Sequence, residues 1–241
     1  MKTKFFITFL TFSILLPLTA LERPLQYVQS ETGVVNSRGY EKTYVPFDLL
    51  YGISDPAQKY EALSALQFTK NAFDLTLTGK YFIPKFNWNP GSTEINLGVG
   101  LWYHFQAYYD LHRENDLIFD TIFRLNWSRF KYEGHFGYGV KFATVNGLSS
   151  SVNPLTDMTL KMSNEFSWNF QNGLELHLLV ASHDLYRFPL FYSPVYNLGA
   201  AWNFTNGFRV NADFGLRMRD QIITAPYMDT IYFRTGVRYT F

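Results

Sequence analysis

The strongest constraint on the fold is a strict alternation of apolar and polar residues. In Phe208–Arg219 (FRVNADFGLRMR), one face carries Phe, Val, Ala, Phe, Leu and Met, and the other carries Arg, Asn, Asp, Gly, Arg and Arg. Because successive side chains of a β-strand point to opposite faces, this pattern predicts a strand with one apolar and one charged face. The same alternation recurs in residues 130–144 and 117–127.

The alternation divides the chain after residue 40 into segments of about ten residues. The pattern favours an all-β fold, an antiparallel up-and-down transmembrane β-barrel of about ten strands, and eight or twelve strands also fit. The first expected strand is the weakest because it contains Pro46. The expected strands are 42–52, 71–86, 93–108, 116–128, 131–145, 157–170, 174–183, 195–204, 208–219 and 231–241.

A repeated phrase marks two of the turns. WNFQNGLEL (168–176) and WNFTNGFRV (202–210) share their Trp-Asn-Phe and Asn-Gly residues. Asn-Gly between alternating segments predicts a hairpin. A two-residue loop would exchange the two faces of the following strand, so we expect three-residue loops with Gly173 and Gly207 in the left-handed conformation.

The expected connections alternate in length. Tight turns fall near 87–92, 129–130, 171–173 and 205–207, and longer links fall at 53–70, 109–115, 146–156, 184–194 and 220–230. Transmembrane barrels combine short periplasmic turns with longer external loops. Four tryptophans lie beside the short turns: Trp88, Trp127, Trp168 and Trp202. Because indole has an apolar body and a polar N–H, this position predicts a periplasmic aromatic girdle.

The N-terminus and the composition agree with export. Residues 1–20 have the layout of a secretory signal peptide, with Lys2 and Lys4 before an apolar run that is short for a membrane helix. Their removal takes two of the 21 Lys and Arg residues and none of the 20 Asp and Glu residues, so the mature chain is nearly neutral. We therefore expect no nucleic-acid partner. The predicted division is a signal peptide (1–20), a periplasmic N-terminal segment (21–41) and the barrel (42–241).

The last strand carries a further signal. IYFRTGVRYTF ends on Phe241, with Tyr239, Val237 and Phe233 on the same face. It resembles the C-terminal signature of bacterial outer-membrane β-barrel proteins. The resemblance implies an outer-membrane location, the lipid bilayer as surroundings and recognition by the barrel assembly machinery. An even number of strands would place both termini in the periplasm. The sequence does not specify an oligomeric state.

A barrel with a lipid-facing apolar surface turns its polar faces inward. The expected interior includes a charged strip of Arg124, Arg209, Asp213, Arg217, Arg219, Arg234 and Arg238. If Arg217 and Arg234 face each other across the last hairpin, the strip favours anionic solutes. Pairing with Asp213 and with Asp48 or Asp74 would instead neutralise it. The predicted function is a narrow passive channel for small polar solutes, including anionic ones, or a structural membrane protein.

Two alternatives use other parts of the chain. The external loops, above all the aromatic 184–194, could bind a ligand or a surface. The second alternative is an outer-membrane hydrolase. Asp110 and His112 resemble half of the omptin protease site, but the matching pair of aspartates is absent. None of the five histidines has Ser two residues later, as the lipid-cleaving barrels require, and Lys161 is an expected partner of His183. No phosphate loop, zinc spacing or calcium loop occurs, so we predict no catalytic residue, cofactor or metal.

Overall fold

A computed structural model gives the fold and describes residues 24–37, 43–70, 72–108, 112–145, 155–182, 194–219 and 227–241. The predicted signal peptide lies outside the described residues. Within them, no helix has the length and apolar character needed to cross a membrane.

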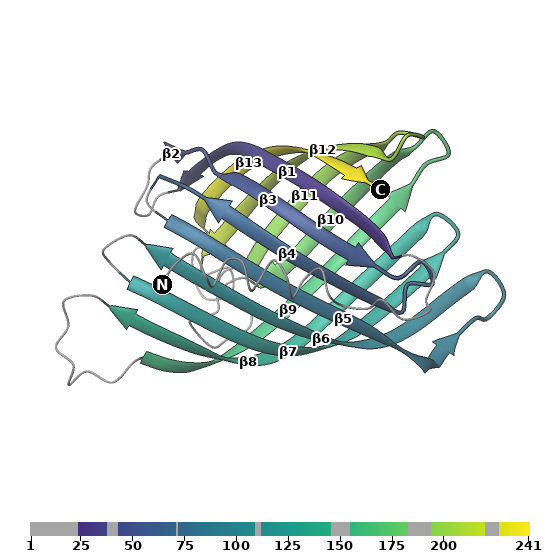
Figure 1. The fold of residues 1–241 in the computed structure, drawn as a ribbon, viewed down its shortest axis with the longest axis horizontal. Helices are drawn as coiled ribbons and strands as arrows, with labels where there is room; N and C mark the ends of the chain where they lie inside the picture. Colours follow the sequence, from purple (N-terminus) through teal and green to yellow (C-terminus); the bar gives the residue numbers. More distant parts are fainter. Residues whose placement is uncertain are drawn as a thin grey trace.

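The described chain is one closed antiparallel sheet (Figure 1). From β3 to β13 each strand pairs with the next one in sequence, and β1 lies between β3 and β13 and closes the ring. The two-residue β2 pairs with Val35 and Asn36 of β1. The strands are β1 (Leu25–Ser37), β2 (Thr43–Tyr44), β3 (Phe47–Ser54), β4 (Tyr60–Phe68), β5 (Ala72–Trp88), β6 (Thr93–Tyr108), β7 (His112–Trp127), β8 (Phe130–Val145), β9 (Leu155–Asn169), β10 (Leu174–Ser182), β11 (Pro194–Asn203), β12 (Phe208–Arg219) and β13 (Tyr227–Thr240).

The described ring therefore has twelve strands, and the preferred count of ten is corrected. The expected periplasmic segment 21–41 contains β1, which closes the barrel between β13 and β3. The expected long link 53–70 contains β4 and a turn at Asp55–Lys59, where the backbone N–H of Gln58 donates to the carbonyl of Asp55. Both strands were missed because Ser30, Thr32 and Ser64 interrupt the apolar faces on which the prediction relied.

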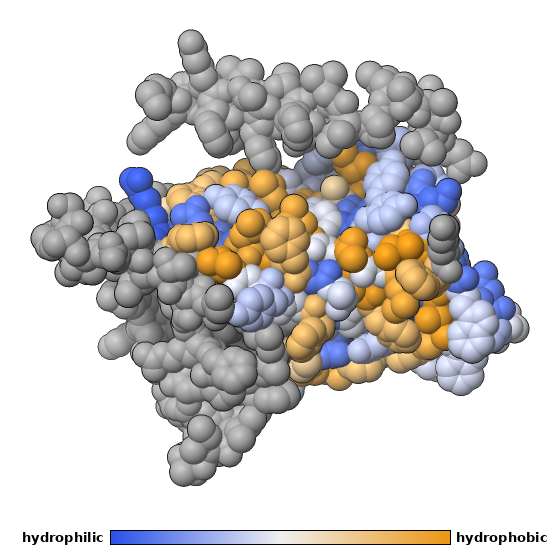
Figure 2. Space-filling model, turned by 90° about the horizontal axis from the view of Figure 1, so that it is seen from below, coloured by the Kyte–Doolittle hydropathy of each residue, from blue (hydrophilic) through white to orange (hydrophobic). Residues whose placement is uncertain are grey.

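The barrel wall has the opposite polarity to a soluble protein. Phe119, Phe136 and Phe214 are exposed on the outside, whereas Asp116 and Arg124 are among the most buried side chains. Figure 2 shows a broad apolar area over one side of the barrel. In lipid, a closed barrel satisfies every backbone group between strands, and its outward side chains replace water contacts with acyl-chain contacts. The predicted inward and outward faces are confirmed for these residues.

The short turns gather at one end of the barrel, on the right in Figure 1, which we call the turn end. Gly173 and Gly207 have φ of 86° and 83°, as expected for the three-residue loops. The carbonyl of Gly173 accepts the N–H of Asn203 at 2.9 Å, and that of Gly207 accepts the N–H of Thr240 at 3.0 Å. Each glycine thus joins its hairpin to a neighbouring strand.

Both ends of the described chain also lie at the turn end. The N–H of Phe241 donates to the carbonyl of Gln26 at 2.9 Å. At the opposite end, which we call the loop end, β6, β8, β10 and β12 end and β7, β9, β11 and β13 begin. Residues 109–111, 146–154, 183–193 and 220–226 lie outside the described residues.

Candidate functional site: the barrel interior

An ion-pair network occupies the interior near the turn end of β4, β5, β7 and β8. We call Glu61, Lys80, Arg124 and Glu133 the Arg124 cluster. The Arg124 guanidinium donates from Nε to Glu133 at 2.7 Å and from its second amino group to Glu61 at 2.6 Å. Lys80 donates to Glu133 at 2.5 Å and lies 3.6 Å from Glu61. Arg124 also stacks on the Phe82 ring, 3.9 Å from its centroid.

The network continues toward the middle of the barrel. His135 contacts Glu133 through Nε2 at 3.0 Å and Asp120 through Nδ1 at 2.8 Å. The indole N–H of Trp102 donates to the same Asp120 carboxylate at 2.7 Å. Trp102 is the one tryptophan that was not assigned to the girdle. Because these groups are buried and mutually bonded, they act as a polar filling of this side of the interior.

A second network lies across the interior on β1, β10 and β12. Arg209 makes two hydrogen bonds to the Glu175 carboxylate, at 2.7 and 2.9 Å. His177 contacts Asp213 at 2.6 Å. The amide of Asn211 donates to Asp213 at 2.7 Å and to Glu31 at 3.2 Å. The Asn211 contact with Glu31 joins β12 to β1 across β13.

The predicted charged strip is divided among these networks. Arg124 lies on β7, away from the other six residues, which lie on β12 and β13. The expectation that Arg217 faces Arg234 is wrong, because the register places Asp213 opposite Arg234 and Thr230 opposite Arg217. The predicted pairing of an arginine with Asp48 is present: Arg234 donates to its carboxylate at 2.8 Å.

Two arginines do face each other, but nearer the turn end. Arg238 lies opposite Arg209 in the register. Their repulsion is reduced because Glu175 binds Arg209, and because the Arg238 guanidinium lies over the Tyr27 ring, 4.8 Å from its centroid. For Arg219 the structure describes the backbone, which pairs with Tyr227.

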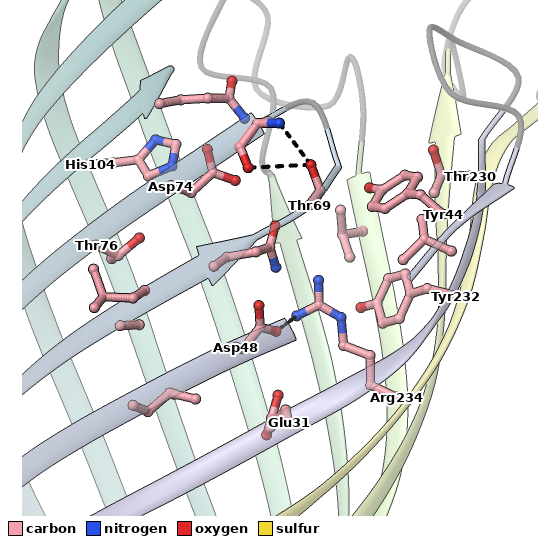
Figure 3. Close-up of a pocket in the computed structure, with 18 of the residues that line it drawn as sticks. Glu31, Tyr44, Asp48, Thr69, Asp74, Thr76, His104, Thr230, Tyr232 and Arg234 are labelled. Carbon is pink, nitrogen blue, oxygen red and sulfur yellow. Dashed lines mark hydrogen bonds and ion pairs between the residues drawn. The ribbon is translucent and has the colours of Figure 1, made fainter. Parts of the chain in front are cut away.

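A cavity of about 690 Å³ occupies the interior toward the loop end (Figure 3). Strands β11 to β13 and β1 to β6 line it on one side of the interior, and all of them except β4 and β11 supply charged groups or hydroxyls to its wall. Its acidic and basic side chains are Glu31, Asp48, Asp74, His104, Arg217 and Arg234. The Asp48–Arg234 ion pair crosses part of this wall, and Asp74 lies beside His104. Polar groups and open volume thus occur together in the loop-end half.

The predicted girdle and assembly residues lie on the outer surface. Trp88, Trp127, Trp168 and Trp202 are exposed and lie at or next to the turn-end limits of β5, β7, β9 and β11. This is the level at which an interfacial girdle is required, and the girdle stays a prediction. Phe233, Val237, Tyr239 and Phe241 are exposed along β13 and its end. Their recognition by the assembly machinery also stays a prediction.

The described histidines contact carboxylates. His104 lies 3.3 Å from Asp116, and His135 and His177 make the contacts given above. Among the described residues, no group of three His, Cys, Asp or Glu side chains that could hold a metal ion occurs. Asp110, His183, the side chains of His112 and Lys161, and the loop 184–193 lie outside what the structure describes. The loop and protease alternatives therefore remain predictions.

No protein-family model matches the sequence, and no curated protein matches it. Among solved structures, the chain is similar to a KdgM porin in complex with disordered oligogalacturonate, with a TM-score of 0.57, 10% identity, and coverage of 89% of this chain and 99% of that one. It is also similar to the NanC porin, with a TM-score of 0.55, 10% identity, and coverage of 88% and 98%. At this identity the likeness concerns the fold.

The fold and the surface lead to the same assignment. The closed barrel is shared with porins, its outward side chains are apolar, and its charged side chains are inside. A water-soluble barrel would not expose such a surface. The chain is therefore a bacterial outer-membrane β-barrel protein.

Proposed function

We propose that this barrel is a narrow passive channel for small polar solutes in the outer membrane. The observation that carries the proposal is the loop-end cavity. It is enclosed by strands of the barrel, and its volume of about 690 Å³ lies within the range of small-molecule sites. Side chains can fill a barrel of eight strands, whereas this ring of twelve strands leaves open volume that a solute can occupy.

The turn-end half provides the constriction. The Arg124 cluster on β4, β5, β7 and β8 and the Arg209–Glu175 pair on β10 and β12 extend from opposite walls. Charged side chains that bond to one another leave narrow, hydrated space rather than a wide pore. We expect the loop-end cavity to admit a solute and the turn-end networks to limit its size.

The arginines alone do not support a preference for anions. Arg209 binds Glu175, Arg234 binds Asp48, and Arg124 binds two glutamates. An arginine that is neutralised by a carboxylate attracts an anion far less than a ring of unpaired cations does. The likeness to porins supports passage of solutes in general. Any preference for solutes of one charge must depend on the residues that line the interior of this barrel.

Single-channel recording in planar bilayers tests the proposal. Protein whose folding is verified by a heat-dependent shift in gel mobility should give discrete conductance steps. The matched control is the same preparation after heat denaturation, which should give none. Vesicles loaded with a small sugar should also release it faster when they contain the folded protein. Folded protein without conductance and without sugar release would overturn the channel and favour the structural alternative.

A further inference from the structure

We propose that the loop-end cavity prefers small cationic solutes and that Asp74 is its main specificity-determining residue. This inference deepens the proposed channel function and rests on it. The preferred solute class is a small polar molecule with an ammonium group.

The first observation is the charge of the cavity wall. Three carboxylates, Glu31, Asp48 and Asp74, line it together with two guanidinium groups, Arg217 and Arg234. Asp48 and Arg234 neutralise each other at 2.8 Å. The other charged groups of the wall are the carboxylates of Glu31 and Asp74 and the guanidinium of Arg217. Arg217 is exposed near the loop-end limit of β12. The carboxylate and guanidinium charges of the wall therefore sum to a negative value, and the His104 ring on the same wall lies 3.3 Å from Asp116.

Asp74 is the carboxylate whose negative charge is least compensated. Within the described part of the chain, no lysine or arginine lies at ion-pair distance from it, and its Oδ1 has no hydrogen-bond partner. The register places it between Gln67 and Gln106, and the Gln106 amide donates to it. In Figure 3, Asp74 and His104 lie side by side on the cavity wall.

Asp48, although it is paired with Arg234, is a second carboxylate of this part of the cavity wall. It lies opposite Gln67 on one side, as Asp74 does on the other, so two carboxylates flank the same amide. Asp48 is 5% exposed, and its Oδ1 also has no partner among the described residues. A buried carboxylate oxygen without a donor is costly. An ammonium group beside Asp74 would supply the donor that its Oδ1 lacks.

The neutral groups around Asp74 suit a polar solute. Thr76 lies two positions along the same strand, and the carbonyl oxygens of Gln67 and Gln106 can accept further hydrogen bonds. A primary ammonium has three donors and no acceptor. Carboxylates and amide carbonyls therefore satisfy it better than they satisfy a solute carboxylate, which brings only acceptors.

The rest of the described interior has the same sign. Among the inward positions whose side chains the structure describes, carboxylates outnumber lysines and arginines. The acidic residues are Glu31, Asp48, Glu61, Asp74, Glu94, Glu114, Asp116, Asp120, Glu133, Glu165, Glu175 and Asp213, and the basic ones are Lys80, Arg124, Lys131, Arg209, Arg217, Arg234 and Arg238. Acidic linings select cations in channels. A solute that passes the cavity therefore meets a path whose described charges also favour a cation.

The test is the reversal potential of single channels under a tenfold KCl gradient. The wild-type channel should pass K⁺ more readily than Cl⁻. Asp74→Asn should lower the ratio of K⁺ to Cl⁻ permeability roughly two- to fivefold, as expected for removal of one charge several ångströms from the ion path. Asp74→Glu is the matched control, because it keeps the charge and should keep the ratio within a factor of about two.

The outcomes separate the two proposals. A wild-type protein that conducts no ions overturns the channel itself. A conducting protein that prefers Cl⁻, or one in which Asp74→Asn and Asp74→Glu have equal ratios, overturns the cation preference and leaves the channel standing. Competition with ethanolamine is the second measurement. Ethanolamine should block K⁺ current in the wild type at lower concentration than in Asp74→Asn, and equal block in both would also refute the role of Asp74.

Discussion

Removal of the Arg124 guanidinium is the most direct test of how the interior is held together. Arg124 is 1% exposed and bonds to Glu61 at 2.6 Å and to Glu133 at 2.7 Å. Arg124→Met keeps much of the side-chain volume and leaves the two glutamates with Lys80. Loss of one partner of a buried ion pair typically costs 3–5 kcal/mol. Because Lys80 still contacts both carboxylates, we expect a loss of about 3 kcal/mol in the free energy of unfolding.

The assay is equilibrium urea unfolding in phospholipid vesicles, followed by gel mobility without heating. Lys131→Met is the matched control. Lys131 has a side chain 41% exposed and lies 3.8 Å from the same Glu133. An exposed pair of this kind contributes about 1 kcal/mol or less. If the two variants lose equal stability, the Arg124 cluster is not the buried network described above.

The same variant tests the position of the constriction. If the Arg124 cluster narrows the turn end, Arg124→Met should increase single-channel conductance, because no guanidinium then ties Glu61 to Glu133 across the interior. Lys131→Met should leave conductance close to the wild-type value. A lower conductance in Arg124→Met, with folding verified by gel mobility, would place the constriction elsewhere.

Three further outcomes follow from the wall, the turns and the cavity. Phe214 is 49% exposed at the middle of β12, so Phe214→Arg should lower the free energy of unfolding in vesicles by roughly 2–4 kcal/mol and Phe214→Leu by much less. Gly207 has φ of 83°, and an added Cβ would lie 2.6 Å from the carbonyl oxygen of Thr240, so urea unfolding should show Gly207→Ala to be less stable than Gly91→Ala, where φ is 65° and nothing lies within 4 Å. Arg234→Gln removes the partner of the Asp48 carboxylate, so the K⁺ to Cl⁻ permeability ratio should rise, and a fall would contradict the charge assignment of the cavity.

The sequence predicted the orientation of the side chains well, because the alternation of side chains between the two faces of a strand is a local property. Once Phe208 and Phe214 are assigned to one face, Arg209 and Asp213 must lie on the other. The same argument gave the three-residue turns at Gly173 and Gly207. It failed where the outward face is not apolar, as at Ser30 and Thr32 of β1, because polar residues on both faces leave no period to detect.

The partners of the charged groups could not be predicted in the same way. Alternation along each strand shows that Arg217 and Arg234 both point to the inner face. The distance between them depends on the register between β12 and β13. No tight turn fixes that register in the sequence, and a shift between Arg217 and Met218 displaces it further. The cavity could not be predicted from the sequence either, because open volume depends on which side chains bond to one another across several strands.

The closure of the ring between β1 and β13 has a consequence for biogenesis. Eleven residue pairs, from Tyr27–Thr240 to Ser37–Thr230, join strands from opposite ends of the chain, whereas the other long strands of the ring pair with neighbours in sequence. Until Phe241 has been delivered to the membrane, β1 and the growing sheet present two complementary unpaired edges, and such edges pair readily with other chains. The N-terminal strand therefore has to be shielded for the whole time of secretion, and a truncation after β12 would leave an open sheet rather than a smaller barrel.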